Sequence, residues 1–99
     1  MKENRYLAAL REIVRKEMSD APAKIYLFGS WAKGEARASS DIDVAIDWAG
    51  DDAAAKIAAL RECIEESPIP YRVDVVHMQQ ASSAMIANIH REGIVWKDG

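Results

Sequence analysis

The sequence predicts a single α+β domain, a small mixed sheet with helices packed on one face. Three observations predict this fold class. Segments with helical and with strand periodicity alternate in the order αβαβαβα, the 99 residues suit one domain spanning 1–99, and the chain contains no internal repeat or low-complexity tract.

The first half of the chain is predicted to form a helix, a strand, a short helix and a strand. Leu7, Leu10 and Met18 recur at helical spacing before Pro22 ends the first helix. A short apolar run then leads into a Gly-Ser turn, and further on apolar residues alternate with aspartates, as in a half-buried strand. The predicted elements are a helix from residue 4 or 5 to 19, a strand at 24–28, a short helix at 30–35 and a strand at 41–48.

The second half is predicted to contain two more helices and a third strand. Residues 50–52 form a turn and a helix cap, and Ile57, Leu60 and Ile64 lie on the inner face of the helix that follows. The prolines in residues 67–70 end that helix. The predicted elements are a helix at 53–66, a strand at 71–78, a helix at 79–90 and a short final segment at 94–96.

The amino-acid composition limits the classes of protein to which this chain can belong. Hydrophobic residues make up 49% and charged residues 29% of the chain, as in an ordinary soluble domain. The net charge of −3 argues against a domain that binds nucleic acid by neutralising phosphates. Cys63 is the single cysteine, so no internal disulfide can form, and a reducing, cytoplasmic setting fits. No apolar run approaches the roughly 20 residues of a membrane span, so no membrane association is expected.

The motif that predicts a function is Gly29-Ser30, followed by ten residues and then Asp41-x-Asp43. A tight Gly-Ser turn can present backbone N–H groups and a hydroxyl to a phosphate. Because side chains alternate along a strand, Asp41 and Asp43 point to one face. Paired carboxylates are the ligands that Mg²⁺ prefers. A phosphate cradle beside paired carboxylates predicts metal-assisted nucleotidyl transfer.

A third carboxylate, Asp74, lies in an otherwise apolar predicted strand. An unpaired carboxylate is costly to bury, so Asp74 either pairs with a cation or faces an open cleft. If the second and third strands are neighbours, Asp74 joins Asp41 and Asp43, and the three charges then require cations between them. The alternative is a simple ion pair between Asp74 and Arg72, two residues away on the same face.

Three further residues of the motif loop are candidate nucleotide contacts. Lys33 and Arg37 could bind phosphates, although a solvated loop charge is an equal alternative for each. Ser40 could orient the start of the strand that carries Asp41, as a structural group or as a neighbour of the metal ligands.

These residues resemble the nucleotidyltransferase superfamily with the polymerase-beta-like fold, and within it the minimal nucleotidyltransferases of the MntA type. Trp31 occupies a position where Arg is also common in this family. The matching pieces are Gly29-Ser30, Ala32, Gly34, the run 40–43, Asp74 and the ending 89–96.

The resemblance implies a mechanism. Gly29 and Ser30 would hold the triphosphate of ATP, and Asp41 and Asp43 would bind two Mg²⁺ ions. Asp74 would complete the metal site and assist deprotonation of the acceptor hydroxyl, which attacks the α-phosphate and releases pyrophosphate.

The resemblance also implies a partner. Members of the minimal branch are often antitoxins for a HEPN-type RNase toxin encoded beside them, and some transfer AMP to a toxin tyrosine. We therefore expect a Mg²⁺-dependent adenylyltransferase that modifies such a toxin. Two alternatives stay open: an antitoxin that neutralises its partner sterically, and the catalytic subunit of a two-chain small-molecule nucleotidyltransferase. A homodimer and a hetero-oligomer with the toxin are both open as assemblies.

Overall fold

A computed structural model describes residues 4–37 and 39–99 of the chain. Helices and strands alternate, and the predicted final segment is a fourth strand. The elements are α1 (Arg5–Glu17), β1 (Lys24–Phe28), α2 (Ser30–Lys33), β2 (Ile42–Asp47), α3 (Ala53–Glu65), β3 (Val73–His77), the 3₁₀ turn η1 (Met78–Gln80), α4 (Ser83–Glu92) and β4 (Ile94–Asp98).

The four strands form one mixed sheet in the order β3-β2-β1-β4. β1 lies in the middle and is antiparallel to both β2 and β4, whereas β2 and β3 are parallel. The small mixed sheet that the sequence predicts is therefore confirmed. The neighbourhood of the second and third strands, on which the position of Asp74 depends, is confirmed as well.

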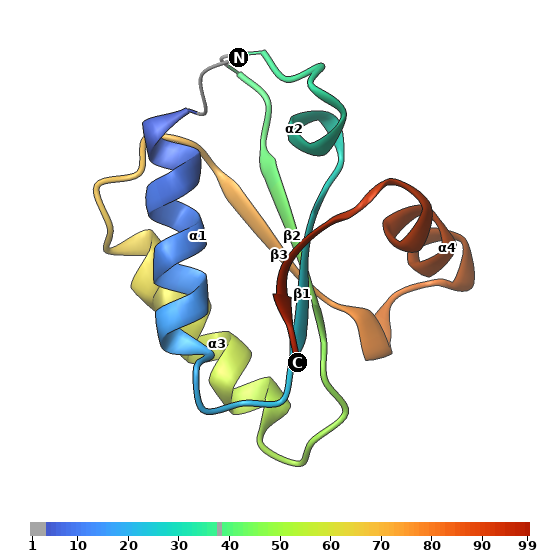
Figure 1. The fold of residues 1–99 in the computed structure, drawn as a ribbon. Coiled ribbons are helices and arrows are strands. Elements are labelled where there is room, and N and C mark those ends of the chain that lie inside the picture. The colour runs from blue at the N-terminus through green and yellow to red at the C-terminus, as the bar shows by residue number, and fades with distance from the viewer. Residues whose placement is uncertain (1–3, 38) are drawn as a thin grey trace.

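The two long helices cover one face of the sheet, and α4 lies on the other side (Figure 1). Leu10 of α1 and Leu60 of α3 are fully buried in the larger core, as their helical spacing predicts. Ile89 of α4 packs instead with Phe28 and Ala45, which point to the opposite face. The prediction of helices on one face thus describes α1 and α3, while α4 covers part of the second face.

The alternation along β2 sets the position of its aspartates. Ile42, Val44 and Ile46 are fully buried and face α1 and α3. Asp43 and Asp47 point to the other face because successive side chains of a strand alternate. Helix α4 covers that face only in part, so the face can carry a polar site.

The last helix begins later than the sequence pattern suggests. Residues 79–90 were expected to be one helix, but Met78–Gln80 forms a 3₁₀ turn and α4 starts at Ser83. The hydroxyl of Ser82 accepts a hydrogen bond from the backbone N–H of Met85 at 3.1 Å, and this cap fixes the start of the helix. The predicted cap of α3 is partly right, because Asp52 occupies the N-cap position but its side chain makes no capping bond.

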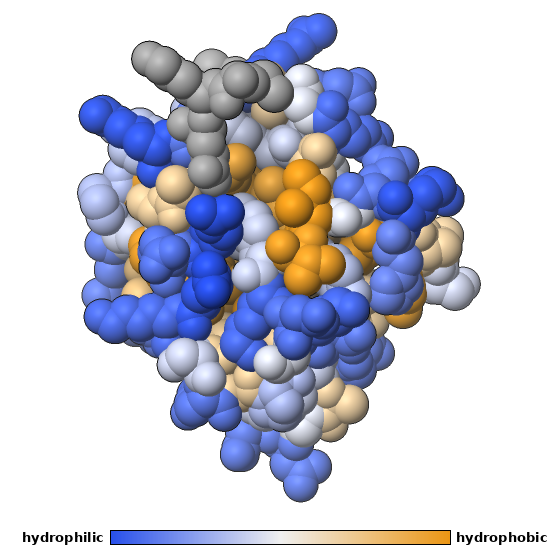
Figure 2. Space-filling view, viewed as in Figure 1, coloured by the Kyte–Doolittle hydropathy of each residue, from blue (hydrophilic) through white to orange (hydrophobic). Residues whose placement is uncertain are grey.

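A hydrophobic patch lies in the middle of the face shown in Figure 2, over the region of β4 in Figure 1. Among the described residues the exposed large apolar side chains are Met85, Ile94 and Val95. Two of these belong to β4, an edge strand of the sheet. None of the helices in the described part of the chain has the length and apolar character needed to span a bilayer.

Candidate active site

The turn after β1 brings the backbone against β2. Gly29 has φ 76°, a conformation that favours glycine, and a Cβ at this position would collide with the Oδ2 atom of Asp43. The N–H groups of Ala32 and Lys33 both donate to the carbonyl of Gly29, at 3.1 and 3.2 Å, and so fold the chain into α2 directly after the turn. Glycine is therefore required at position 29 for two reasons: the positive φ angle, and the close approach of the backbone to Asp43.

The three aspartates converge on this turn from two strands. In the strand register Asp43 lies opposite Phe28, which precedes Gly29, on one side and opposite Asp74 on the other. Asp41 precedes β2 by one residue and shares the face of Asp43 because the two are separated by one position. Asp43 is half-buried, whereas Asp41 and Asp74 are exposed. The structure thus brings together the four residues of the motif and the third carboxylate, Asp74.

The pKa of Asp43 is affected by the other two carboxylates. Burial raises the pKa of Asp43 above its usual range, and the negative charges of Asp74 and then Asp41 raise it further. The carboxylates are therefore an unfavourable charge cluster in the protein alone. A divalent cation would remove that repulsion, and this is the physical reason to expect one here.

The donor set fits Mg²⁺ held jointly with a nucleotide. Within residues 4–37 and 39–99, no group of three or more His, Cys, Asp or Glu side chains is arranged to hold a metal ion by itself. Mg²⁺ does not need such a cage, because it is usually bound by one or two carboxylates, several waters and the phosphates of the substrate. Asp41 and Asp43 could supply those carboxylates, beside the turn at Gly29. The prediction that Asp74 joins them as a ligand stays a prediction.

Arg72 was the alternative partner for Asp74, but its side chain lies nearer to Asp41. Its Nε atom lies 3.9 Å from Oδ2 of Asp41, on a side chain that is 85% exposed. The ion pair that Arg72 forms is therefore a long contact with Asp41, and not the alternative pairing with Asp74. An exposed contact of this length contributes little to stability.

Trp31 is a positioning residue that the sequence did not reveal. Its indole Nε1–H donates to the carbonyl of Ser40 at 3.2 Å, directly before Asp41. Its ring also packs edge-on against Tyr71, with ring centroids 5.0 Å apart, directly before Arg72. One side chain in α2 thus fixes the segments that lead into β2 and into β3. A tryptophan in the middle of the motif loop was the available signal, but its partners lie far away in the sequence.

The remaining predicted contacts have other partners in this structure. Lys33 forms an ion pair with Oε2 of Glu92 at 3.0 Å, which connects α2 to the end of α4. The hydroxyl of Ser40 accepts a hydrogen bond from the backbone N–H of Arg37 at 2.9 Å, as expected for a structural group. Arg37 itself is exposed. Phosphate contacts from these three residues stay predictions.

The family model for polymerase beta nucleotidyltransferases matches residues 9–98. Fold and motif thus define a nucleotidyltransferase domain, and the chain belongs to the polymerase beta nucleotidyltransferase family. Among curated proteins, none matches this chain significantly.

Solved structures narrow the comparison to the minimal members. The chain is similar to a minimal nucleotidyltransferase, with 30% identity and a TM-score of 0.73, over 89% of this chain and 90% of that chain. It is also similar to a toxin–antitoxin structure with AMP-PNP, with 25% identity and a TM-score of 0.73, over 90% of this chain and 73% of that chain.

A third structure shares the fold. It is the complex of a tri-AMPylated Shewanella oneidensis HEPN toxin with an MNT antitoxin, at 22% identity and a TM-score of 0.60, over 93% of this chain and 72% of that chain. The resemblance to minimal nucleotidyltransferases that the motif predicts is confirmed by these comparisons.

Proposed function

We propose that this protein is a Mg²⁺-dependent adenylyltransferase that transfers AMP from ATP to a tyrosine of a HEPN-type RNase toxin and so acts as its antitoxin. One observation carries the proposal. In the strand register Asp43 lies between Phe28, which precedes the turn at Gly29, and Asp74, and this arrangement of a Gly-Ser turn beside three carboxylates supports the proposal.

The position of each residue suggests its role in the proposed reaction. The turn at Gly29 and Ser30 would bind the triphosphate through backbone N–H groups and the serine hydroxyl. Asp41 and Asp43 would hold Mg²⁺ together with phosphate oxygens. When bound, the metal supplies charge neutralisation at the attacking and leaving oxygens. Asp74 lies beyond Asp43 and would face the acceptor.

The proposed reaction balances as a single displacement. The acceptor hydroxyl oxygen forms a bond to the α-phosphorus of ATP, and the bond from that phosphorus to the bridging oxygen of the β-phosphate breaks. Pyrophosphate leaves with the bonding electrons. The hydroxyl proton passes to a carboxylate oxygen of Asp74, which is exposed and therefore accessible to an acceptor.

Support for a protein acceptor comes from the comparisons and from the openness of the site. One similar structure is a toxin–antitoxin with AMP-PNP, and another contains an AMPylated HEPN toxin. Asp41 and Asp74 are both exposed, so a hydroxyl on the surface of another protein could reach them. The AMP-PNP in the first of these structures supports ATP as the nucleotide.

The deciding experiment measures transfer with and without the carboxylate pair. The protein is incubated with α-labelled ATP, Mg²⁺ and the HEPN-type protein encoded beside it, and the partner is analysed by intact mass and peptide mapping. We expect AMP on a partner tyrosine with the wild type and at least about a hundredfold less with Asp41→Ala/Asp43→Ala. Chelation of Mg²⁺ by EDTA should have the same effect.

The same experiment separates the two alternatives. A stable complex that silences the RNase without label, and does so equally with the double variant, would replace the proposal with a steric antitoxin. Labelling of an added aminoglycoside-like alcohol, with none on the protein, would indicate the small-molecule enzyme instead.

A further inference from the structure

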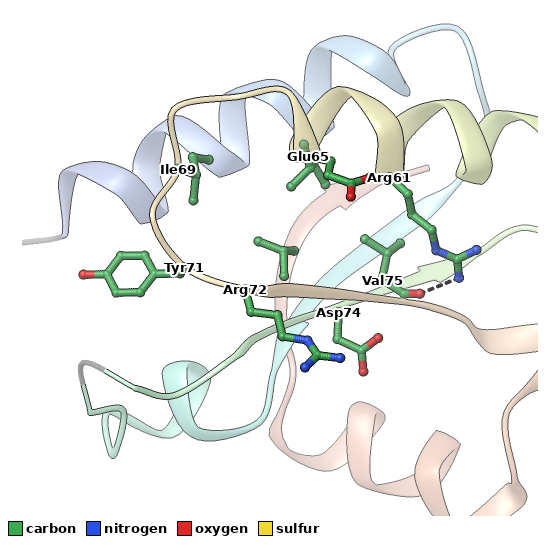
Figure 3. A pocket seen from close by; sticks show the side chains of 9 residues that line it. Arg61, Glu65, Ile69, Tyr71, Arg72, Asp74 and Val75 are labelled. Atoms are coloured by element: carbon green, nitrogen blue, oxygen red, sulfur yellow. Dashed lines mark hydrogen bonds between the residues drawn. The ribbon is translucent and has the colours of Figure 1, made fainter.

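A concavity lies beside β3, outside the cluster of catalytic carboxylates. Its volume is about 450 Å³, and it is bounded by the second half of α3, the segment that precedes β3 and β3 itself. Figure 3 shows Ile69, Val75 and Arg61 around it, with Asp74 projecting from the other side of the strand. Ile64 and Val75 form a buried apolar floor, and Ile69 is only partly buried. The concavity therefore combines an apolar floor with a polar rim that includes the carboxylate of Asp74.

β3 is an edge strand, and its outer edge has a defined pattern. In the part of the chain that the structure describes, β3 pairs with β2 alone, and the N–H of Ile42 donates to the carbonyl of Arg72 at 2.9 Å. Because backbone groups of alternate residues face opposite edges, those of Val73 and Val75 face away from β2. The carbonyl of Val75 indeed accepts a hydrogen bond from Nη2 of Arg61, at 2.7 Å (Figure 3). The side chain of Arg61 thus occupies an edge position that another strand could use.

The in-line geometry of phosphoryl transfer indicates that the acceptor approaches from the side of β3. In a phosphoryl displacement the attacking and leaving oxygens lie roughly in line on opposite sides of the phosphorus. The turn at Gly29 follows β1, so pyrophosphate bound there leaves on the side of β1. The acceptor must then approach from the opposite side, and across the sheet from β1 the next strands are β2 and β3. Asp74 lines the concavity and is also the register partner of Asp43, so it joins the two regions.

We propose that the outer edge of β3 and its concavity bind the acceptor segment of the protein substrate in an extended conformation. The segment adds to β3 as a further strand, and one of its backbone N–H groups replaces the guanidinium Nη2 of Arg61 as the donor to the carbonyl of Val75. An apolar side chain of the segment enters beside Ile69, and the acceptor hydroxyl lies at Asp74. Arg72, with its exposed guanidinium at the rim, can pair with an acidic residue of the segment. This inference rests on the proposed function and specifies where its protein substrate docks.

Two variants test the docking site by different means. Val73→Pro removes an outward N–H from the edge while leaving the ladder to β2 intact, a position where strands tolerate proline. Ile69→Asp places a charge in the apolar part of the concavity. Ile94→Asp is the matched control, because Ile94 is 46% exposed on the opposite edge strand. The measured quantities are KM and kcat for AMP transfer to the HEPN-type protein, and the Tm increase caused by AMP-PNP with Mg²⁺.

We expect Val73→Pro and Ile69→Asp each to raise KM for the acceptor protein about tenfold or more, with an unchanged Tm increase from AMP-PNP. Ile94→Asp should behave like the wild type. If Val73→Pro fails to fold, Ile69→Asp decides alone.

The contrary outcomes are distinct. Unchanged KM in the folded β3 variants, in a wild type that does transfer AMP, overturns the docking site and leaves the proposed function standing. A raised KM for Ile94→Asp alone would place the acceptor at β4 and also overturn it. Absence of transfer by the wild type would overturn both proposals together.

Discussion

At the scale of single residues, two glycines with the same backbone conformation have different surroundings. Gly29 and Gly34 have φ angles of 76° and 74°. A Cβ at Gly29 meets the carboxylate of Asp43, whereas a Cβ at Gly34 meets no atom of residues 4–37 and 39–99 within 4 Å. Both positions are strained for alanine, but only the substitution at Gly29 displaces the carboxylate of Asp43, the proposed metal ligand.

This difference gives a matched pair of variants. Gly29→Ala should reduce AMP transfer about a hundredfold or more, because it moves Asp43 and the phosphate-binding turn apart. Gly34→Ala should lower the free energy of unfolding by about 1 kcal/mol, the cost of a left-handed alanine, with little loss of transfer. Steady-state kinetics and thermal unfolding of both variants check this. Equal loss of activity in the two variants would show that strain, and not the contact with Asp43, controls the site.

At the scale of the elements, α2 positions the segments that lead into two strands. Trp31 donates to the carbonyl of Ser40 and packs against Tyr71. Trp31→Phe keeps an aromatic ring against Tyr71 but removes the N–H donor. We expect kcat for AMP transfer to fall about five- to tenfold, since one hydrogen bond contributes about 1 kcal/mol. KM for ATP should change little.

Trp48→Phe is the control for this prediction, because Trp48 is also partly packed against the core but lies beyond the other end of β2. A fall in kcat of the same size in both variants would indicate a general loss of packing. Wild-type kcat in Trp31→Phe would remove the positioning role of the indole N–H.

The sequence predicts the parts of the site that depend on local patterns. The alternation of Ile42, Val44 and Ile46 with aspartates places Asp43 on the polar face, and the structure confirms it. The sequence predicts that Asp74 joins Asp41 and Asp43 only if the second and third strands are neighbours. Local periodicity does not encode which distant strands pair. The partners of Trp31 and Lys33 depend in the same way on tertiary packing.

At the scale of the whole molecule, the site reduces the stability of the fold. Burial and the charges of Asp74 and Asp41 raise the pKa of Asp43 in the folded protein. The folded chain then holds a proton at Asp43 more tightly than the unfolded chain does. The contribution of Asp43 to stability is therefore most favourable below the ordinary pKa of an aspartate and is lost as the pH rises through the raised value.

This linkage predicts how a neutral side chain and a metal change stability. In EDTA at pH 7, Asp43→Asn should raise Tm slightly, because solvent screening at the half-exposed Asp43 keeps the gain below about 1 kcal/mol, which would correspond to about 4–8 °C in a domain of this size. The gain should vanish as the pH falls below the ordinary pKa of an aspartate, because Asp43 is then neutral in both states. Mg²⁺ with AMP-PNP should stabilise the wild type and not the variant, because the variant lacks one carboxylate ligand.

Thermal unfolding from pH 3 to pH 8, with EDTA or with Mg²⁺ and AMP-PNP, measures both effects. Asp47→Asn is the control on the same strand; its carboxylate accepts a hydrogen bond from Gln79 at 2.7 Å, so its substitution should bring no gain. An Asp43→Asn variant that is less stable than the wild type in EDTA at pH 7 would contradict the argument. It would show that Asp43 stabilises the fold without a cation, and the charge cluster would then no longer indicate a metal site.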